Sequence, residues 1–278
     1  MIGRRALLAT GAAFAAFPPY ARARSARLTF SGTLDQGSLV VGRTSPDARV
    51  SVEGKPVTVS PEGIFAFGFE YNQTAAANVA ARFRDGTREE QAVAPIARHY
   101  EVQPINGLPH KFVEPSPEEI ARIKSEHARV AQMRQTDSEM PWFAEPFDWP
   151  AKGIISGLFG SQRILNGIPS APHMGVDIAG GEGAPIHAPA NGMVLIADKF
   201  YLEGGYTLLD HGHGVFTGYM HQSVQLVKPG DAVQRGQQIG NIGQTGRATG
   251  PHLHWQMNWF QVRLDPSLSA RTPAPAKA

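Results

Sequence analysis

Short runs of β-forming residues alternate with turn signals over the first third of the chain, a spacing typical of an antiparallel sandwich. The apolar residues Phe65, Phe67 and Phe69 fall at every second position, so they share one strand face and are expected to supply core. Asp85-Gly86 is typical of a hairpin turn. The expected strands are 38–41, 49–52, 57–59, 64–69 and 78–84. We therefore predict a small N-terminal β-sandwich over residues 24–100, with an immunoglobulin-like arrangement as one possible form.

After the predicted sandwich, the hydrophobic residues follow a helical period in one segment of the chain. Ser116 is placed as an N-cap, Pro117 stands at the first helical position and Glu119 completes a capping box. The apolar stripe that follows predicts a helix over 117–134, within a linker of residues 101–148. His127 lies on this stripe and is expected to pack rather than to bind a ligand.

Glycine-rich β-type runs resume after a cluster of Pro, Trp and Phe at residues 140–150. They continue to about Pro266 and predict a second β domain over residues 149–266. The composition of residues 267–278 favours a disordered tail. The fold class is therefore mainly β, with two β-rich domains joined by a linker helix.

The N-terminus has the composition of an export signal. Arg4 and Arg5 precede an apolar run over residues 6–17, and Ala21-Arg22-Ala23 matches a small-x-small cleavage site. The run is shorter than the ~20 residues of a membrane span, so we expect a removable signal over residues 1–23 and no stable membrane span. The paired arginines are a feature of twin-arginine signals, and the general secretory route stays open as the alternative. The protein is thus expected in the periplasm or cell envelope, or secreted.

Charge and cysteine content exclude several functions. The chain of 278 residues has a formal net charge of +2, which becomes −1 when the expected signal and its three arginines are removed. The remaining sequence has no basic run, so a nucleic-acid partner is not expected. There is no cysteine, so any metal must be held by His, Asp or Glu.

Two histidine motifs in the second domain have the spacing of metal ligands. Pro172 and Gly175 favour an extended segment, whose two-residue period puts His173 and Asp177 on one face. The same alternation puts His252 and His254 side by side. A catalytic zinc ion takes three protein ligands and leaves a position for water, so these four groups compete for three places. His211 and His213 repeat the HxH spacing, but the surrounding glycines and Asp210 favour a turn.

These motifs resemble those of the lysostaphin-like (LytM-type) zinc metallopeptidases, which carry HxxxD and a later HxH. The resemblance covers most of residues 150–266 and implies a lysostaphin-like antiparallel β peptidase fold. It includes residues 155–160 with Arg163, 173–179, 188–194, 218–221, 227–230 and 236–254. It implies that zinc is bound by His173, Asp177 and His254, and that His221 and His252 stand beside the metal.

The resemblance also implies an exported zinc metalloendopeptidase that cuts stem or cross-link peptides of peptidoglycan. His252 is then the candidate general base, and His221 donates to the oxyanion or steers the water, with the two roles exchangeable. The resemblance also suggests that Arg163 and Asn166 line the groove or orient ligands, with a purely structural loop as the alternative. Two other functions stay open: a silent wall-binding activator, and a zinc hydrolase of another amide bond. The N-terminal domain could bind wall polymer, cover the groove or stabilise the peptidase, and we expect a monomer.

Overall fold

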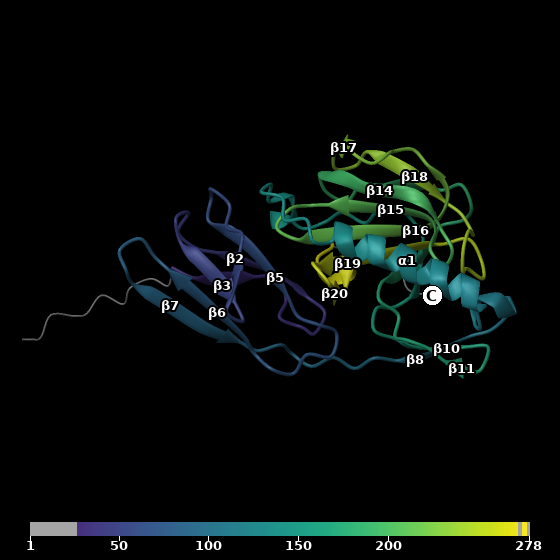
Figure 1. The fold of residues 1–278 in the computed structure, drawn as a ribbon, viewed down its shortest axis with the longest axis horizontal. Helices are drawn as coiled ribbons and strands as arrows, with labels where there is room; N and C mark the ends of the chain where they lie inside the picture. The colour runs from purple at the N-terminus through teal and green to yellow at the C-terminus, as the bar shows by residue number, and fades with distance from the viewer. Residues whose placement is uncertain (1–26, 272–273, 277–278) are drawn as a thin grey trace, which may run out of the picture.

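The computed structural model describes residues 27–271 and 274–276 and is mainly β, as expected. Figure 1 shows a strand-rich N-terminal part beside a larger C-terminal sheet, with one long helix across the latter. The expected export signal, residues 1–23, lies outside the described residues. Among the helices that the structure describes, none has the length and apolar character needed to cross a membrane.

The N-terminal part folds into two antiparallel sheets that face a common core. One sheet has the order β1-β2-β5 and the other the order β4-β3-β6-β7. The strands are β1 (Thr29–Ser31), β2 (Leu39–Arg43), β3 (Arg49–Val52), β4 (Lys55–Val57), β5 (Ile64–Gly68), β6 (Ala77–Arg82) and β7 (Arg88–Val93). Phe65, Phe67 and Phe69 are fully buried in this core. The chain turns between β6 and β7 at Asp85-Gly86, where Gly86 has a φ of 79°.

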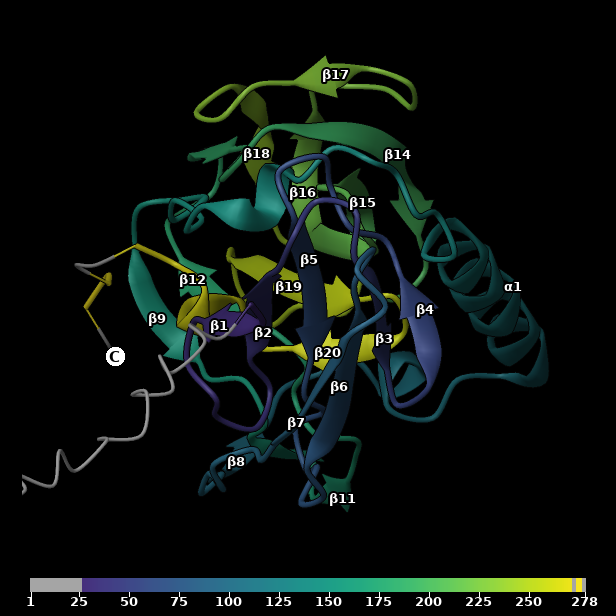
Figure 2. The same cartoon turned by 90° about the vertical axis from the view of Figure 1, so that its left-hand side faces the viewer.

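Strand β5 is buried on both faces because it lies between two cores. Its phenylalanines face the sandwich, whereas Ile64 and Ala66 join the core of the C-terminal part. Gly68 also meets that part, since a Cβ atom there would lie 2.6 Å from Leu264 Cδ2. The sheet β1-β2-β5 therefore rests directly against the C-terminal part. Figure 2 views the molecule from the side of the sandwich, with these strands in front of the C-terminal sheet.

The linker wraps one side of the C-terminal part. Strand β8 (Val102–Ile105) pairs in parallel with β10 (Gln162–Leu165), which forms a hairpin with β11 (Ile168–Pro169). A short 3-10 turn, η1 (His110–Phe112), then leads to helix α1 (Pro117–Met133), and η2 (Trp142–Ala144) follows the helix.

Helix α1 begins with the predicted capping box, in which Ser116 Oγ accepts from the backbone N–H of Glu119. Its residue Val130 packs with Tyr206 and Phe216 of the C-terminal sheet. The expectation that His127 packs was wrong. Its side chain is 55% exposed, and Nε2 lies 3.1 Å from Glu203 Oε1.

A ten-stranded sheet forms the C-terminal part. Its main path runs β17-β14-β15-β16-β19-β12-β9, with β13, β18 and β20 paired off this path. The strands are β9 (Ile154–Gly157), β12 (Val176–Ala179), β13 (Pro185–His187), β14 (Gly192–Phe200), β15 (Gly204–Asp210), β16 (Val215–Gln225), β17 (Ala232–Val233), β18 (Gln238–Ile242), β19 (Leu253–Trp259) and β20 (Val262–Leu264). All seven residues of β15 are buried, because cores cover both faces of the sheet there.

Residues 267–271 are ordered, in contrast to the disordered tail expected from residue 267 onward. Asp265 caps the 3-10 helix η3 (Pro266–Leu268) by accepting from the backbone N–H of Ser267. The Arg271 N–H then donates to the carbonyl of Phe147. A cap and a backbone bond to a distant segment hold this end, and composition alone does not reveal such contacts.

Candidate metal centre

Two neighbouring strands and the segment before one of them bring three side chains together. Asp177 of β12 lies directly opposite His254 of β19 in the antiparallel register. His173 precedes β12 and is fixed by its backbone, because its N–H donates to Ser161 and its carbonyl accepts from Gly160. All three residues are buried, with 7–9% of their surface exposed.

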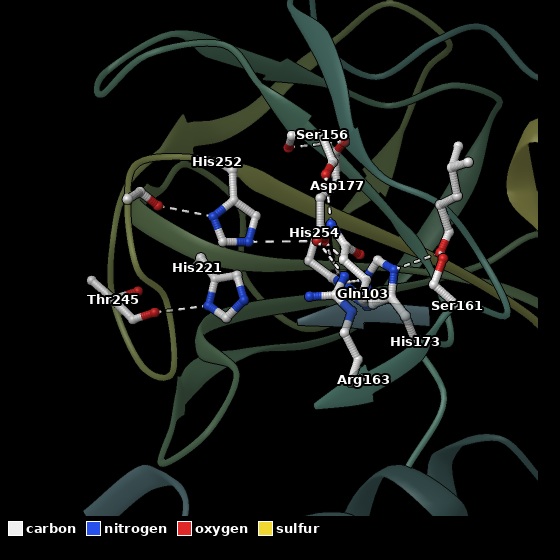
Figure 3. A network of polar contacts seen from close by, with 12 residues as sticks. Gln103, Ser156, Ser161, Arg163, His173, Asp177, His221, Thr245, His252 and His254 are labelled. Atoms are coloured by element: carbon white, nitrogen blue, oxygen red, sulfur yellow. Dashed lines mark hydrogen bonds and ion pairs between the residues drawn. The ribbon is translucent and has the colours of Figure 1, made fainter. Parts of the chain in front are cut away.

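The ligand atoms of this group converge on one point. His173 Nε2 lies 3.0 Å from Asp177 Oδ1 and 2.9 Å from His254 Nδ1. The distance from His254 Nδ1 to Asp177 Oδ1 is 2.8 Å. Among the described residues, these three form the group of histidines and acids that could hold a metal ion. Figure 3 shows them at the centre of the site.

The second atoms of these ligands are held by neighbours. The Nδ1–H of His173 donates to the Leu158 carbonyl at 3.0 Å, which leaves a lone pair on Nε2. Arg163 Nη2 donates to Asp177 Oδ2 at 2.8 Å, so that Oδ1 alone faces the centre. Partners of this kind fix the tautomer and orientation of metal ligands.

The donor set fits a cation. His173 Nε2, His254 Nδ1 and Asp177 Oδ1 lie within 3.0 Å of one another, an arrangement that a proton or a metal cation among them stabilises. Burial raises the pKa of Asp177, but its contacts with His173 and His254 outweigh that effect and hold the pKa well below the usual range. Burial lowers the pKa of His254 to about 4. The carboxyl is thus ionised and the His254 imidazole neutral at neutral pH, as metal ligands require.

His221 and His252 lie together beside the centre and are not part of the converging group. Their ring centroids are 4.7 Å apart, and His252 Nε2 lies 3.8 Å from Asp177 Oδ1. The Nδ1–H of His221 donates to the Thr245 carbonyl, and that of His252 donates to the Gly250 carbonyl. Both rings therefore keep an Nε2 lone pair, which can accept a proton.

His221 has a left-handed backbone, with a φ of 63°, in the strand β16. Its N–H donates to the Glu203 carbonyl in the β14–β15 turn. A positive φ is rare outside glycine, and such strained residues concentrate at functional sites.

The other histidines lie outside the centre. His211 and His213 occupy the β15–β16 turn expected from their glycines, and both are buried rather than solvent-facing. The Nδ1–H of His211 donates to the Asn191 carbonyl, and the Nε2–H of His213 donates to the Glu139 carbonyl. These contacts give them a structural role.

Arg163 and Asn166 are close in sequence but contact different parts of the molecule. Arg163 contacts the centre through Asp177. Asn166 instead holds the linker, since its amide exchanges two hydrogen bonds with the backbone of Leu108. These contacts agree with the interpretation that Asn166 has a structural role in its loop.

A groove of about 700 Å³ surrounds the centre, and several of its residues carry no sequence signal. One wall comes from the linker, including Gln103, whose buried Oε1 has no hydrogen-bond partner among the described residues. The end near α1 includes Gln256, Arg247 and Arg263. Arg247 and Gln256 lie near the HxH motif in the sequence, whereas Gln103 and Arg263 do not. Only the fold shows that they all line the groove.

The sequence matches a known family over this region. Residues 171–266 match the model of peptidase family M23. Peptidoglycan DD-endopeptidase ShyA of Vibrio cholerae is 44% identical over 87 residues, which are 31% of this chain and 20% of that protein. Peptidoglycan DD-endopeptidase ShyB of the same organism is 42% identical over 139 residues, 50% of this chain and 33% of that protein. The chain thus spans a fifth to a third of the length of these relatives.

A solved structure extends the likeness over most of the chain. It is described as a putative peptidase M23 from Pseudomonas aeruginosa, and it is 29% identical with a TM-score of 0.67. The match covers 85% of this chain and 94% of that one, so it includes the N-terminal part as well. The residues that carry the converging ligands lie inside the matched family region, and residues 171–266 form a domain of peptidase family M23.

Proposed function

We propose that the protein is a zinc metalloendopeptidase that hydrolyses peptide bonds in the stem or cross-link peptides of peptidoglycan. The observation that carries the proposal is the convergence of His173, Asp177 and His254 on one point of an accessible groove. Two imidazoles and one carboxylate are a ligand set of catalytic zinc sites, which keep a further position for water. When bound, zinc supplies Lewis acidity and makes water acidic near neutral pH.

His252 is the proposed general base. Its Nδ1–H bond to the Gly250 carbonyl leaves Nε2 free to take a proton from the attacking water. The protonated ring can then deliver that proton to the leaving amine. Its position beside Asp177 keeps the ring next to the metal ligands without joining them.

His221 is proposed to steer the water. Because its Nδ1–H is committed to the Thr245 carbonyl, the neutral ring accepts a hydrogen bond through Nε2. This arrangement favours water positioning over donation to the oxyanion. Burial, with His252 and His254 nearby, lowers the pKa of His221 to about 3, which agrees with a neutral ring. The two histidines have the same hydrogen-bond pattern, but the low pKa of His221 disfavours it as the base, so the base role is assigned to His252.

The proposed substrate comes from the relatives. Both curated proteins named above are peptidoglycan DD-endopeptidases, and the metal-site motifs of this chain lie in the region that matches peptidase family M23. An export signal over residues 1–23 would bring the enzyme to the periplasm or cell envelope, where that polymer lies. The groove is open enough to admit a peptide beside the linker wall.

The test uses residues 24–278, prepared with zinc and incubated with purified cell wall. We expect zinc bound near one ion per chain, and release of peptide-cleaved fragments that mass spectrometry identifies. His252→Ala should release few or no fragments. His110→Ala, at an exposed histidine outside the groove, is the matched control and should digest normally. A zinc-loaded, folded protein that leaves cell wall intact would contradict the proposal.

A further inference from the structure

A cluster of arginines occupies the end of the groove next to helix α1. Arg263 on β20 and Arg247 in the segment after β18 line the groove, and both are partly buried. Arg134, the C-cap residue of α1, lies behind them and is only 3% exposed. Arg263 lies within electrostatic range of Arg134, and both Arg247 and Arg263 lie within range of Glu203, so several guanidinium groups share this end of the groove.

These charges are poorly matched by acids. Glu203 is the carboxylate whose charge acts on both Arg247 and Arg263, and its Oε1 contacts His127 rather than an arginine. The ion pairs formed by the described residues include none of Arg134, Arg247 and Arg263. Burial, helped by the charge of Arg134, lowers the pKa of Arg263 to about 10. The groove end therefore has an excess of positive charge.

The cluster lies close to the metal centre on the same face of the sheet. His254 and Gln256 are two residues apart on β19, so they point to one face with a spacing of about 7 Å. Arg134 Nη2 donates to Gln256 Oε1 at 2.9 Å. Arg263 is paired in register with Asn258, two residues further along. A peptide cut at the metal would place a neighbouring residue at this cluster.

We propose that Arg247 and Arg263 form a subsite for a carboxylate of the substrate peptide, close to the bond that is cut. This inference rests on the proposed peptidase function and adds a specificity determinant to it. A peptide carries its negative charges as carboxylates, and the planar guanidinium matches that group with two parallel hydrogen bonds. Arg134 has no direct part in binding and instead positions Gln256 and adds charge from behind.

The test compares one substrate in two forms. Cross-linked peptides released from cell wall are used with their carboxyl groups free, or after conversion of those groups to primary amides. We expect kcat/KM of the zinc enzyme to fall about 10–100-fold on amidation, the size expected for a lost charge-assisted hydrogen bond. Arg263→Gln and Arg247→Gln should each reduce this preference, and Arg263→Lys should keep part of it. Equal cleavage of the two forms by the unmodified enzyme would overturn the inference.

A binding measurement separates this inference from the peptidase proposal. Calorimetry with the protein stripped of metal should show tighter binding of the free-carboxylate peptides, and Arg263→Gln should remove the difference. That result supports the subsite even if neither form is cleaved, whereas equal affinities would contradict it. Arg84→Gln, at an exposed arginine, is the control and should keep the full preference.

Thermal unfolding distinguishes binding from a structural role. Arg263 is partly buried among like charges and belongs to no ion pair of the described residues, so Arg263→Gln should not lower the unfolding temperature. A loss of preference together with a marked loss of stability would instead indicate a structural arginine.

Discussion

Asp177 divides its two carboxylate oxygens between the centre and Arg163. Oδ1 faces His173 and His254, whereas Oδ2 accepts from Arg163 Nη2 at 2.8 Å. The arginine is itself largely buried, with 13% of its side chain exposed. It therefore acts as an orienting partner for the carboxylate, in the manner of the outer contacts that support metal ligands.

Removing this partner should weaken the metal site without abolishing it. We predict that Arg163→Met lowers zinc affinity about 10–100-fold, since Asp177 loses its fixed orientation. Competition with a chromophoric chelator measures the change, and Arg84→Met serves as the exposed control. An unchanged zinc affinity in Arg163→Met would show that the pair has no role in orienting the ligand.

Periodicity predicted which residues gather at the site, whereas the choice of His254 over His252 as a ligand came from the family resemblance alone. Two-residue alternation indicates His173 with Asp177, and His252 with His254, but it treats both members of the HxH pair alike. The register of β12 against β19 distinguishes them, because Asp177 lies opposite His254. That pairing joins segments 77 residues apart, and local periodicity contains no such information. The same reason hides Arg263, which lies outside the histidine motifs.

Strand β12 pairs with both β9 and β19, so these three strands lie side by side at the metal centre. Gly157 of β9 lies opposite Asp177, and a Cβ atom there would be 2.3 Å from Asp177 Oδ2 and 2.9 Å from Arg163 Nη2. Both contacts are far shorter than van der Waals distances. A glycine is therefore needed for the carboxylate and the guanidinium to meet over this strand.

Adding a methyl group to that strand should disturb the site. We predict that Gly157→Ala separates Asp177 from Arg163 and lowers zinc affinity at least 10-fold, by the same loss of ligand orientation. Gly250→Ala is the control, because a Cβ atom at Gly250 meets nothing within 4 Å. Equal zinc affinities in the two variants would contradict the steric argument.

At the scale of elements, local patterns predicted the strands and the helix well. Both the capping box of α1 and the turn at Asp85-Gly86 use neighbours in sequence. The parallel pairing of β8 with β10 was not foreseen, because it depends on contacts across some 60 residues. Strand β5 is apolar on both faces because one face packs against the core of the C-terminal part. The sequence of the first domain alone does not reveal this second contact.

Two contacts join the N-terminal sandwich to the C-terminal part: the packing of β5 and a largely buried ion pair. Arg98 Nη2 lies 2.9 Å from Asp265 Oδ2, with 24% of the arginine side chain and 2% of the aspartate side chain exposed. The Asp265 N–H also donates to the Gly37 carbonyl in the sandwich. The N-terminal part is thus packed against the peptidase domain, which favours a stabilising role for it.

Breaking this pair should destabilise the protein more than breaking an exposed one. We predict that Arg98→Met lowers the free energy of unfolding by about 2–4 kcal/mol, because it leaves the Asp265 carboxylate buried without its cation. Arg88→Met removes an exposed pair with Glu90 and should cost below about 1 kcal/mol. Urea denaturation compares the two, and similar losses would argue against a role of Arg98 in joining the parts.

The division of the site into ligands and catalytic histidines is the central claim. Its most direct test is the zinc content of two purified variants, with peptidoglycan cleavage measured on the same samples. We predict that Asp177→Ala binds no zinc, whereas His221→Ala keeps zinc near one ion per chain and loses most turnover. Loss of zinc from a folded His221→Ala protein, or zinc retained by Asp177→Ala, would contradict it.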